Sequence, residues 1–418
     1  MKNSFKSISA ILLISAVLCG CNDKTDSNSS VSDYQSSIVQ QSSSESSESS
    51  EISIDTYSDI ESSETSIDTS NVYNFEKKYF VSKLDKDMLE NFVSIYNAVS
   101  NFEEYVSFKQ EIAEDELDTL MYLLNYDCPE LIHVSGDYVP EYIDYNETTK
   151  VSGVTFEYIM TEDEYNSYMT QLTDFFDDLK NLLDGKSELE KEKYVYDLLF
   201  NSCVYNETDS LSGSVCGVLL EGKGRCESFS KSFLWCMQEL DIECMALLGE
   251  PLWENDAIYS KHSWNIVKIN GNYYHVDLTV DNIPTTDSGT NPAFYGFFNV
   301  DDKFISKSHA IDSIYKELGV PECNSNDCNY HIMNNLYVSE GTDVESALEE
   351  ILTENFNNGL ENISIKFDSY DDYCYVIENI SYYTSDFLAN ISDVDYTYIS
   401  MYNNVAQSII FVTEPQTE

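Results

Sequence analysis

The sequence predicts an α+β fold in which a helix that carries Cys226 packs on an antiparallel sheet. Two observations predict this core. Apolar residues follow Cys226 at the spacing of one helical face, and two alternating apolar runs flank the pair Asn270-Gly271, which is typical of a tight hairpin turn. Short helical and strand patterns before and after the core predict small flanking α+β modules.

Composition limits the classes of partner. The 418 residues hold 75 acidic and 22 basic side chains, which gives a net charge of −53. A polyanion of this kind is repelled by nucleic acid and by anionic lipid surfaces, so we expect neither as a ligand. The same charge favours a protein that stays monomeric.

The chain is expected to divide into six segments. These are a signal peptide at 1–21, a Ser-rich acidic tether at 22–74, an N-terminal module at 75–185, a core domain at 186–315, a linker at 316–340 and a C-terminal module at 341–418.

The first 21 residues predict a signal peptide that directs the protein to a membrane. Lys2 and Lys6 precede the apolar run "ISAILLISAVL", which is too short for a mature membrane helix. The run ends in "LCGC", which resembles the signal of bacterial lipoproteins and implies lipid on Cys21. We therefore expect an extracytoplasmic, lipid-anchored protein at the cell surface. The alternative is an ordinary secretory signal in which Cys21 has no role.

The tether has the composition of a disordered spacer. Residues 25–76 contain no Lys or Arg, and "SSSESSESSE" is typical of the segment. Low hydrophobicity and a single sign of charge cannot offset the entropy of ordering the chain. We expect this segment to separate the folded part from the membrane.

The two flanking modules carry patterns of secondary structure but no evident chemistry, so we expect them to pack and present the core. In the long helix of the N-terminal module, we expect Leu172, Phe175, Leu179 and Leu182 to face inward. The predicted N-terminal elements are helices over 86–101 and around 117–124, a strand at 151–160, and helices opened by the capping boxes Thr161/Glu164 and Ser187/Glu190. The predicted C-terminal elements are helices at 343–358 and 371–389, a strand at 363–367, and a hairpin joined by Asn403-Asn404.

Cys226 is predicted to lie in the first turn of its helix. Gly222 and Gly224 allow the preceding loop to turn tightly, and Phe229 begins the buried stripe. Free N–H groups and the helix dipole favour a thiolate at such a position, and Arg225 adds positive charge. The alternative is a small core cysteine, as we expect for Cys236.

The hairpin predicts a partner for this thiol. If Asn270 and Gly271 form the loop, Trp264 stands opposite Asp277 and His262 stands opposite Thr279. His262 and Asp277 are then diagonal neighbours on one face, within reach of a hydrogen bond. A carboxylate that orients an imidazole near an activated cysteine is the arrangement used in nucleophilic catalysis. Trp264 and His275 share this face, and we expect both to pack behind the reacting groups.

Several ordered blocks resemble the transglutaminase-like superfamily of the papain-like cysteine enzymes. They are "GKGRCESFSKSF", "HSWNIVKINGNYYHVDLTVDN" and "FYGFFNVDD", and the resemblance covers roughly 187–315. It implies that Cys226 is the nucleophile, His262 the base and Asp277 the orienting acid of a catalytic domain. The chain departs from the family at Val280-Asp281 and Ser228-Phe229, positions that concern the substrate pocket more than the triad.

The resemblance implies acyl transfer from a protein or peptide amide without a metal or other cofactor. A Cys226 thioester would be resolved by an amine, which gives a crosslink, or by water, which gives hydrolysis. Two alternatives stay open: a cysteine peptidase or amidase acting on cell-wall or host protein, and a non-enzymatic surface module that binds such a ligand.

The other cysteines and histidines give weaker signals. Nine of the 11 cysteines remain once Cys19 leaves with the signal and Cys21 carries lipid. A disulfide between Cys323 and Cys328 is possible, and no zinc-type spacing occurs. We expect His309 to be structural, and His133 and His331 have no partner that the sequence identifies.

Overall fold

The computed structural model describes residues 75–415, apart from 146–147, 207, 210, 254–260, 283–292, 360–361 and 388–395. The predicted signal peptide, Cys21 and the predicted tether lie outside the described residues. Among the helices of the described part, none combines the length and the apolar character needed to cross a bilayer.

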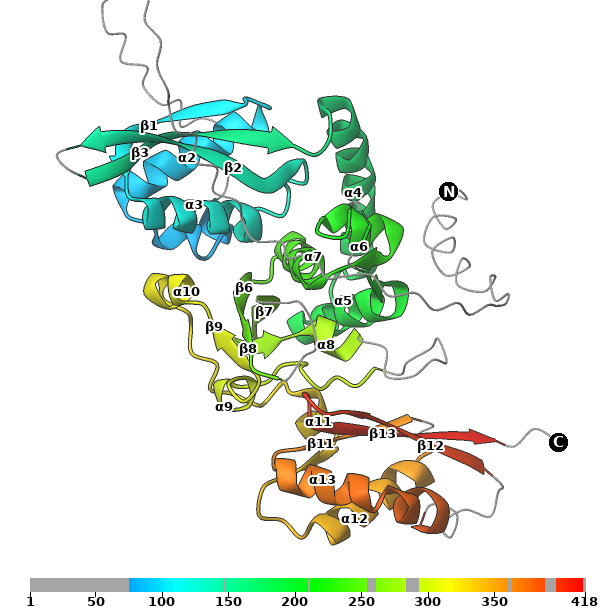
Figure 1. The fold of residues 1–418 in the computed structure, drawn as a ribbon. Helices are drawn as coiled ribbons and strands as arrows, with labels where there is room; N and C mark the ends of the chain where they lie inside the picture. The colour runs from blue at the N-terminus through cyan, green and yellow to red at the C-terminus, as the bar shows by residue number, and fades with distance from the viewer. Residues whose placement is uncertain are drawn as a thin grey trace, which may run out of the picture. The chain divides into compact units, whose positions relative to one another are not determined.

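An antiparallel sheet in the order β1-β3-β2 and the helices α2 and α3 form the N-terminal part (Figure 1). Its elements are η1 (Phe75–Lys77), η2 (Val81–Lys83), α2 (Lys86–Ser100), β1 (Tyr105–Ile112), α3 (Glu114–Asp127), β2 (Val134–Tyr145) and β3 (Thr148–Tyr158). The helices and β3 were predicted. The sequence analysis missed β1, which is largely exposed and polar, and β2, which contains Gly136 and Pro140, because neither alternates clearly.

The two long helices that follow, α4 (Glu162–Leu182) and α5 (Glu188–Ser202), open with the predicted capping boxes. One inward position was wrong: the side chain of Leu182 is 50% exposed. The buried stripe of α4 is Leu172, Phe176 and Leu179, and it continues to the buried Leu183 just past the helix. The helical spacing of the buried residues was therefore right, but Phe176 takes the place of Phe175 in the buried stripe and Leu183 takes the place of Leu182.

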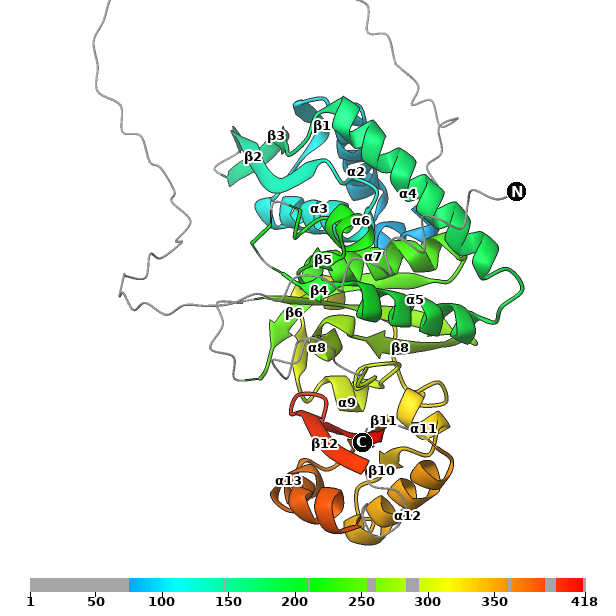
Figure 2. The same cartoon turned by 90° about the vertical axis from the view of Figure 1, so that its right-hand side faces the viewer.

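The core places α7 (Cys226–Glu239) against the strands β6 (Cys244–Pro251) and β7 (His262–Ile269). Figure 2 shows this helix and α5 beside the sheet, whose strand order is β8-β7-β6-β9 with antiparallel pairing throughout. The remaining elements are β4 (Val204–Tyr205), α6 (Val215–Glu221), β5 (Lys223–Gly224), β8 (Asn272–Val276), α8 (Leu278–Asn282), α9 (Asp302–Ile305), β9 (His309–Ile311) and α10 (Ser313–Leu318). The α+β fold class predicted from the sequence is confirmed.

The predicted hairpin is confirmed in its register, because Ile269 pairs with Asn272 and Asn265 pairs with Val276. Asn270 and Gly271 have φ of 52° and 87°, so both central residues of the turn take the left-handed conformation that Asn-Gly favours. The predicted pairing of His262 with Thr279 was wrong, since β8 ends at Val276. The carboxylate of Asp277 explains this end: its Oδ1 accepts the N–H of Thr279 at 2.9 Å and that of Val280 at 3.2 Å, which starts α8.

The C-terminal part has its own hydrophobic cluster and a sheet in the order β10-β11-β13-β12. Its elements are α11 (Tyr330–Met333), β10 (Tyr337–Val338), α12 (Val344–Asn357), β11 (Asn362–Phe367), α13 (Tyr370–Glu378), the π-helix η3 (Tyr382–Phe387), β12 (Tyr396–Asn403) and β13 (Ser408–Pro415). The predicted hairpin forms, but its loop is longer than Asn403-Asn404. Asn403 pairs with Ser408, and its side chain accepts the N–H groups of Val405 and Ala406.

Two side chains of the C-terminal part donate hydrogen bonds to backbone carbonyls of the core, one before and one after residues 283–292. Ser364 donates to the carbonyl of Phe294 at 2.7 Å, and Asn403 donates to the carbonyl of Val280 at 3.1 Å. The second contact lies three residues after Asp277. The C-terminal sheet therefore supports the segment that follows the predicted orienting acid.

Two cysteines and two histidines for which the sequence predicted no catalytic role are buried in the structure. Cys323 and Cys328 are both free and buried, so this structure does not contain the possible disulfide. His133 lies 2.9 Å from the carbonyl of Val99, and His331 lies 3.0 Å from the hydroxyl of Ser364. Both histidines are buried, which agrees with a packing role.

Candidate active site

Cys226 is the first residue of α7, as predicted, and its side chain is partly exposed. The helix start is fixed by Ser228, whose hydroxyl accepts the N–H of Arg225 at 3.0 Å and donates to the carbonyl of Ser212 at 2.6 Å. Cys236 lies further along the same helix and is fully buried, and burial raises the pKa of its thiol. The two cysteines therefore differ in access to solvent as the sequence predicted.

His262 begins β7 and stands between Cys226 and Asp277. Its Nε2 donates to Oδ2 of Asp277 at 2.6 Å. Burial lowers the pKa of His262, but the charge of Asp277, the hydrogen bond to Asp277 and the nearby Cys226 outweigh burial and raise it above its usual range. The arrangement favours a charged imidazolium beside the thiol.

Asp277 is buried and fully hydrogen bonded. Its Oδ1 accepts the two N–H groups at the start of α8, and its Oδ2 accepts from His262 and also from Nε2 of His309 at 3.0 Å. Burial alone would raise the pKa of Asp277. The charge of His262 and the hydrogen bonds from both histidines have the larger effect and lower the pKa below its usual value. The carboxylate is therefore ionised and held from four directions.

His309 is the residue of this cluster that the sequence analysis did not place. It lies on β9, where it pairs with Pro251 of β6, and it is buried. Burial lowers the pKa of His309 to about 4, so the ring is neutral at neutral pH. With the proton on Nε2 facing Asp277, Nδ1 accepts from the hydroxyl of Ser308 at 2.8 Å. Nothing local in "KSHAID" indicates this contact, which depends on how β9 pairs with β6.

Trp264 and His275 pack behind the site, as predicted. The ring of Trp264 lies nearly parallel to that of His262, with an interplanar angle of 15° and centroids 6.2 Å apart. Its indole N–H donates to Nδ1 of His275 at 3.1 Å, and Nε2 of His275 lies 2.9 Å from Oδ1 of Asp302. These two linked hydrogen bonds fix the ring of Trp264 beside His262. Trp253 covers both His262 and His309 edge-on, with centroids 5.3 and 5.0 Å away.

Two groups of side chains among the described residues bring three potential metal ligands close together. One is His262, Asp277 and His309, and the other is His275, Asp302 and Cys323. Ligand atoms about 2.1 Å from a tetrahedral zinc ion would lie about 3.4 Å from one another. The N···O distances of 2.6, 3.0 and 2.9 Å in these groups are shorter and fit hydrogen bonds. The donor sets therefore do not match a tetrahedral metal site.

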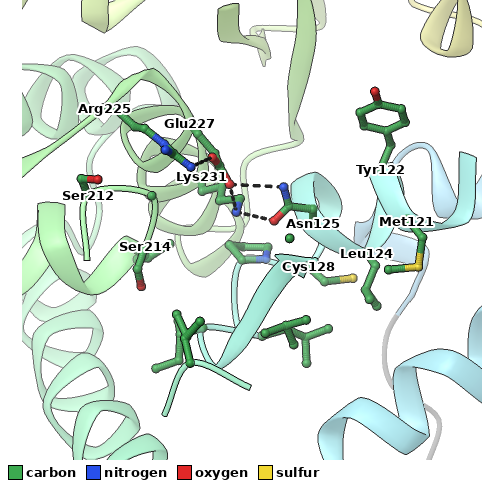
Figure 3. Close-up of a pocket in the computed structure, with 18 of the residues that line it drawn as sticks. Met121, Tyr122, Leu124, Asn125, Cys128, Ser212, Ser214, Arg225, Glu227 and Lys231 are labelled. Carbon is green, nitrogen blue, oxygen red and sulfur yellow. Dashed lines mark hydrogen bonds and ion pairs between the residues drawn. The ribbon is translucent and has the colours of Figure 1, made fainter. Parts of the chain in front are cut away.

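A cavity of about 570 Å³ lies beside the start of α7 (Figure 3). Arg225 and Glu227, the two chain neighbours of Cys226, line one wall, whereas Cys226 itself is not among the lining residues. The N-terminal part supplies the opposite wall, mainly through α3 and β2, which include Tyr122 and Tyr138. The sequence assigned this module no part in the site, because a contact between segments about 100 residues apart leaves no local pattern.

A buried hydrogen-bonded triangle joins the two walls of the cavity. Nζ of Lys231 donates to Asn125 at 2.6 Å and to Glu227 at 2.7 Å, and the amide of Asn125 donates to the same carboxylate at 3.2 Å (Figure 3). The contacts fix α3 against α7. The N-terminal part is therefore connected directly to the helix that carries Cys226.

Comparisons with known proteins find one protein family and several solved structures that are similar to parts of this chain. Residues 179–278 match the family model for the transglutaminase-like superfamily. No curated protein matches the chain in a sequence comparison. A structure of a protein proposed to be a cysteine protease, from Cytophaga hutchinsonii, is similar with 18% identity over 35% of this chain and 63% of that chain, at a TM-score of 0.23. A structure described as a TGase is similar with 14% identity over 57% and 59% of the two chains, at a TM-score of 0.25.

This chain thus covers less than two thirds of the length of each of the two solved structures. The match to the family model is confined to one segment, which contains the start of α7 and the β7–β8 hairpin. The segment 179–278, which contains Cys226, His262 and Asp277, is similar to the transglutaminase-like superfamily.

Proposed function

We propose that this protein is a cysteine acyl-transfer enzyme that acts on protein or peptide amides. One observation carries the proposal: Nε2 of His262 is hydrogen bonded to Asp277 at 2.6 Å, and His262 lies close enough to Cys226 for the thiol to affect its pKa. A structural imidazole does not need both a partly exposed thiol nearby and a buried carboxylate as its partner. The match of residues 179–278 to the model of a superfamily that includes cysteine enzymes supports the same chemistry.

The first half-reaction forms a thioester. The thiolate of Cys226 attacks the amide carbonyl, and the developing oxyanion is stabilised by the backbone N–H of Cys226 in the first turn of α7. Imidazolium His262 gives its proton to the departing amine as the C–N bond breaks. Asp277 holds the imidazole in place and stabilises its charge throughout.

The second half-reaction transfers the acyl group. Neutral His262 takes a proton from an attacking amine or water, which forms the new bond to the acyl carbon while the thiolate of Cys226 leaves. A lysine amine gives a crosslink, and water gives the hydrolysis of a peptidase or amidase. We assign the enzyme to the cell surface, through lipid on Cys21, because "LCGC" closes a short apolar leader.

Trapping of the acyl-enzyme tests the proposal. The purified protein is incubated with glutamine-containing peptides and a fluorescent primary amine, and the intact mass, amine incorporation and ammonia release are measured. We expect a peptide adduct on Cys226, which Cys226→Ala abolishes; incorporation of the amine separates crosslinking from hydrolysis. Turnover that survives Cys226→Ala would exclude this mechanism, and peptide binding without any adduct would support the non-enzymatic binding module.

A further inference from the structure

Arg225 is the only arginine in the 418 residues, in a chain whose other 21 basic side chains are all lysine. It stands immediately before Cys226 in the chain and lines the cavity at the start of α7. Lysine suffices wherever a chain needs only solvated positive charge, whereas arginine provides a planar fork of donors that matches a carboxylate. The single arginine stands beside the candidate nucleophile, so we expect it to have a role that a lysine could not fill.

The guanidinium of Arg225 is anchored through one of its nitrogens. Nη2 donates to Oε2 of Glu227 at 2.8 Å, and Glu227 is itself bound by Lys231 and Asn125 (Figure 3). Burial raises the pKa of Glu227, but Lys231 and Arg225 outweigh it and lower the pKa to about 2. A Cβ at position 213 would lie 2.8 Å from Nη2, so Gly213 leaves the space that the guanidinium occupies.

The rest of the guanidinium is available to a ligand. The side chain of Arg225 is 45% exposed, and its only side-chain hydrogen bond among the described residues is the one to Glu227, which uses one of five N–H donors. Arg225, Glu227 and Lys231 together carry one net positive charge. The aspartates on the cavity wall have partners of their own: Asp209 pairs with Lys223 at 2.5 Å, and Asp118 accepts from Tyr138 at 2.9 Å.

The chemistry that fits this fork is a carboxylate. Arginine binds carboxylates through two parallel hydrogen bonds, and such charge-assisted bonds are among the strongest in proteins. A net charge of −53 disfavours the approach of any anion, so a fixed local cation is needed if the substrate carries one. Because Arg225 directly precedes Cys226 in the chain, an anion on its guanidinium would belong to a part of the substrate near the reacting amide.

We propose that Arg225 is a specificity-determining residue that binds a carboxylate of the acyl donor next to the amide that Cys226 attacks. The proposal rests on the acyl-transfer function proposed above and names its donor class: peptides with a carboxylate near the reactive amide. That carboxylate is either an acidic side chain or a free C-terminus. Both have the same chemistry, and they are separated by the peptides used in the test.

Alkylation by two matched reagents tests the anion site without requiring turnover. Iodoacetate and iodoacetamide both consume the thiolate, and they differ in the carboxylate that iodoacetate carries. The ratio of their rates at Cys226, read by peptide mass spectrometry, cancels the fraction of thiol that is ionised. Cys374, which is also free and partly exposed, serves as the reference thiol within each sample.

In the wild type we expect the iodoacetate-to-iodoacetamide ratio at Cys226 to exceed that at Cys374. Arg225→Met should lower the Cys226 ratio by about tenfold or more, as expected for loss of a charge-assisted hydrogen bond, while the Cys374 ratio stays constant. Arg225→Lys should fall between the two, because it keeps the charge but loses the fork. Lys186→Met, which removes an exposed cation that neither lines the cavity nor pairs with a residue that lines it, is the control and should leave the ratio unchanged.

Protection by peptides identifies the source of the carboxylate. Glutamine peptides with an adjacent Glu or Gln, each with a free or an amidated C-terminus, are added before iodoacetate. Protection that follows the Glu assigns a side-chain carboxylate, and protection that follows the free end assigns a C-terminal one. An unchanged ratio in Arg225→Met, or equal protection by all four peptides, would overturn the inference and leave the acyl-transfer mechanism standing. No alkylation of Cys226 by either reagent would instead refute the proposed function, and the inference with it.

Discussion

Oδ2 of Asp277 accepts two hydrogen bonds, one from His262 at 2.6 Å and one from His309 at 3.0 Å. The two rings differ in charge, because Asp277 raises the pKa of His262 whereas burial lowers that of His309 to about 4. His309 is thus a neutral donor that holds the carboxylate, while His262 is the group that exchanges protons. Ser308 fixes the tautomer that this task requires.

Removal of the second donor should impair the site without removing any reacting group. We expect His309→Phe to lower kcat by about tenfold or more, because Asp277 can then rotate and misplace His262. His309→Gln carries an amide donor and should recover part of the loss. The measurement is kcat and KM for both variants with one peptide amide. Equal defects in the Phe and Gln variants, or a change in KM alone, would contradict a positioning role.

The low pKa of His309 also predicts how stability depends on pH. The unfolded ring has a pKa near 6.5, so as pH falls the unfolded chain binds the proton first. The stabilisation that comes from neutral His309 is complete above about pH 6.5 and is lost as pH falls toward 4. The stability lost over this range amounts to about 3 kcal/mol. Urea unfolding of the wild type and His309→Phe should show the stability difference shrinking over this range. A difference that is constant with pH would show that His309 is not the titrating group.

Local sequence signals accounted for the elements that carry the predicted triad. Asn270-Gly271 determined the hairpin register, which is confirmed from Ile269–Asn272 to Asn265–Val276. His262 and Asp277 lie beyond the last pair of this ladder, and their predicted contact is confirmed by the hydrogen bond between their side chains. The capping boxes of α4 and α5 marked two helix starts for the same reason, since each is complete within four residues. Such features depend on chain geometry alone.

Features that depend on packing between distant segments were missed. His309 reaches Asp277 through pairing of β9 with β6, and the connection between those strands does not determine the pairing. Asn125 meets Lys231 and Glu227 only when α3 packs on α7. The end of β8 was misplaced for a different, local reason: the carboxylate of Asp277 accepts the backbone N–H groups of Thr279 and Val280 and turns the chain into α8.

The contact between α3 and α7 should be important for stability. Lys231→Met leaves the partly buried carboxylate of Glu227 with Arg225 as its only cation, and we expect a loss of about 2 kcal/mol in the free energy of unfolding. The double variant Glu227→Gln/Lys231→Met removes both charges and should recover much of that loss. Chemical denaturation of the three proteins measures the effect. A double variant no more stable than Lys231→Met would show that the pair is not the stabilising contact.

The tether predicts a specific cleavage pattern. Residues 25–76 hold no Lys or Arg but include Glu45, Glu48, Glu51 and further acids. If the segment is disordered, a glutamate-specific protease at low dose should cut there first and leave a stable fragment that begins near residue 75. Trypsin should leave the same stretch intact. Early glutamate-specific cuts within the folded part, with the tether intact, would contradict the prediction.

The charged imidazole of His262 near Cys226 predicts how thiol reactivity divides among the variants. His262→Gln removes the cation beside the thiol, so labelling of Cys226 by iodoacetamide at neutral pH should slow by about tenfold or more. Asp277→Asn keeps the imidazole and the helix N-terminus, so labelling should slow less, while turnover falls much further because the ring loses the carboxylate that orients it and stabilises its charge. Cys236 and Cys244, both buried with thiol pKa values raised by burial, should label slowly in every variant. Rates are measured from pH 5 to 9 with the labelled sites read by mass spectrometry. If Cys226 labels no faster than the buried thiols, and His262→Gln changes nothing, the chain has the fold of a cysteine enzyme without its chemistry, and the binding-module alternative takes its place.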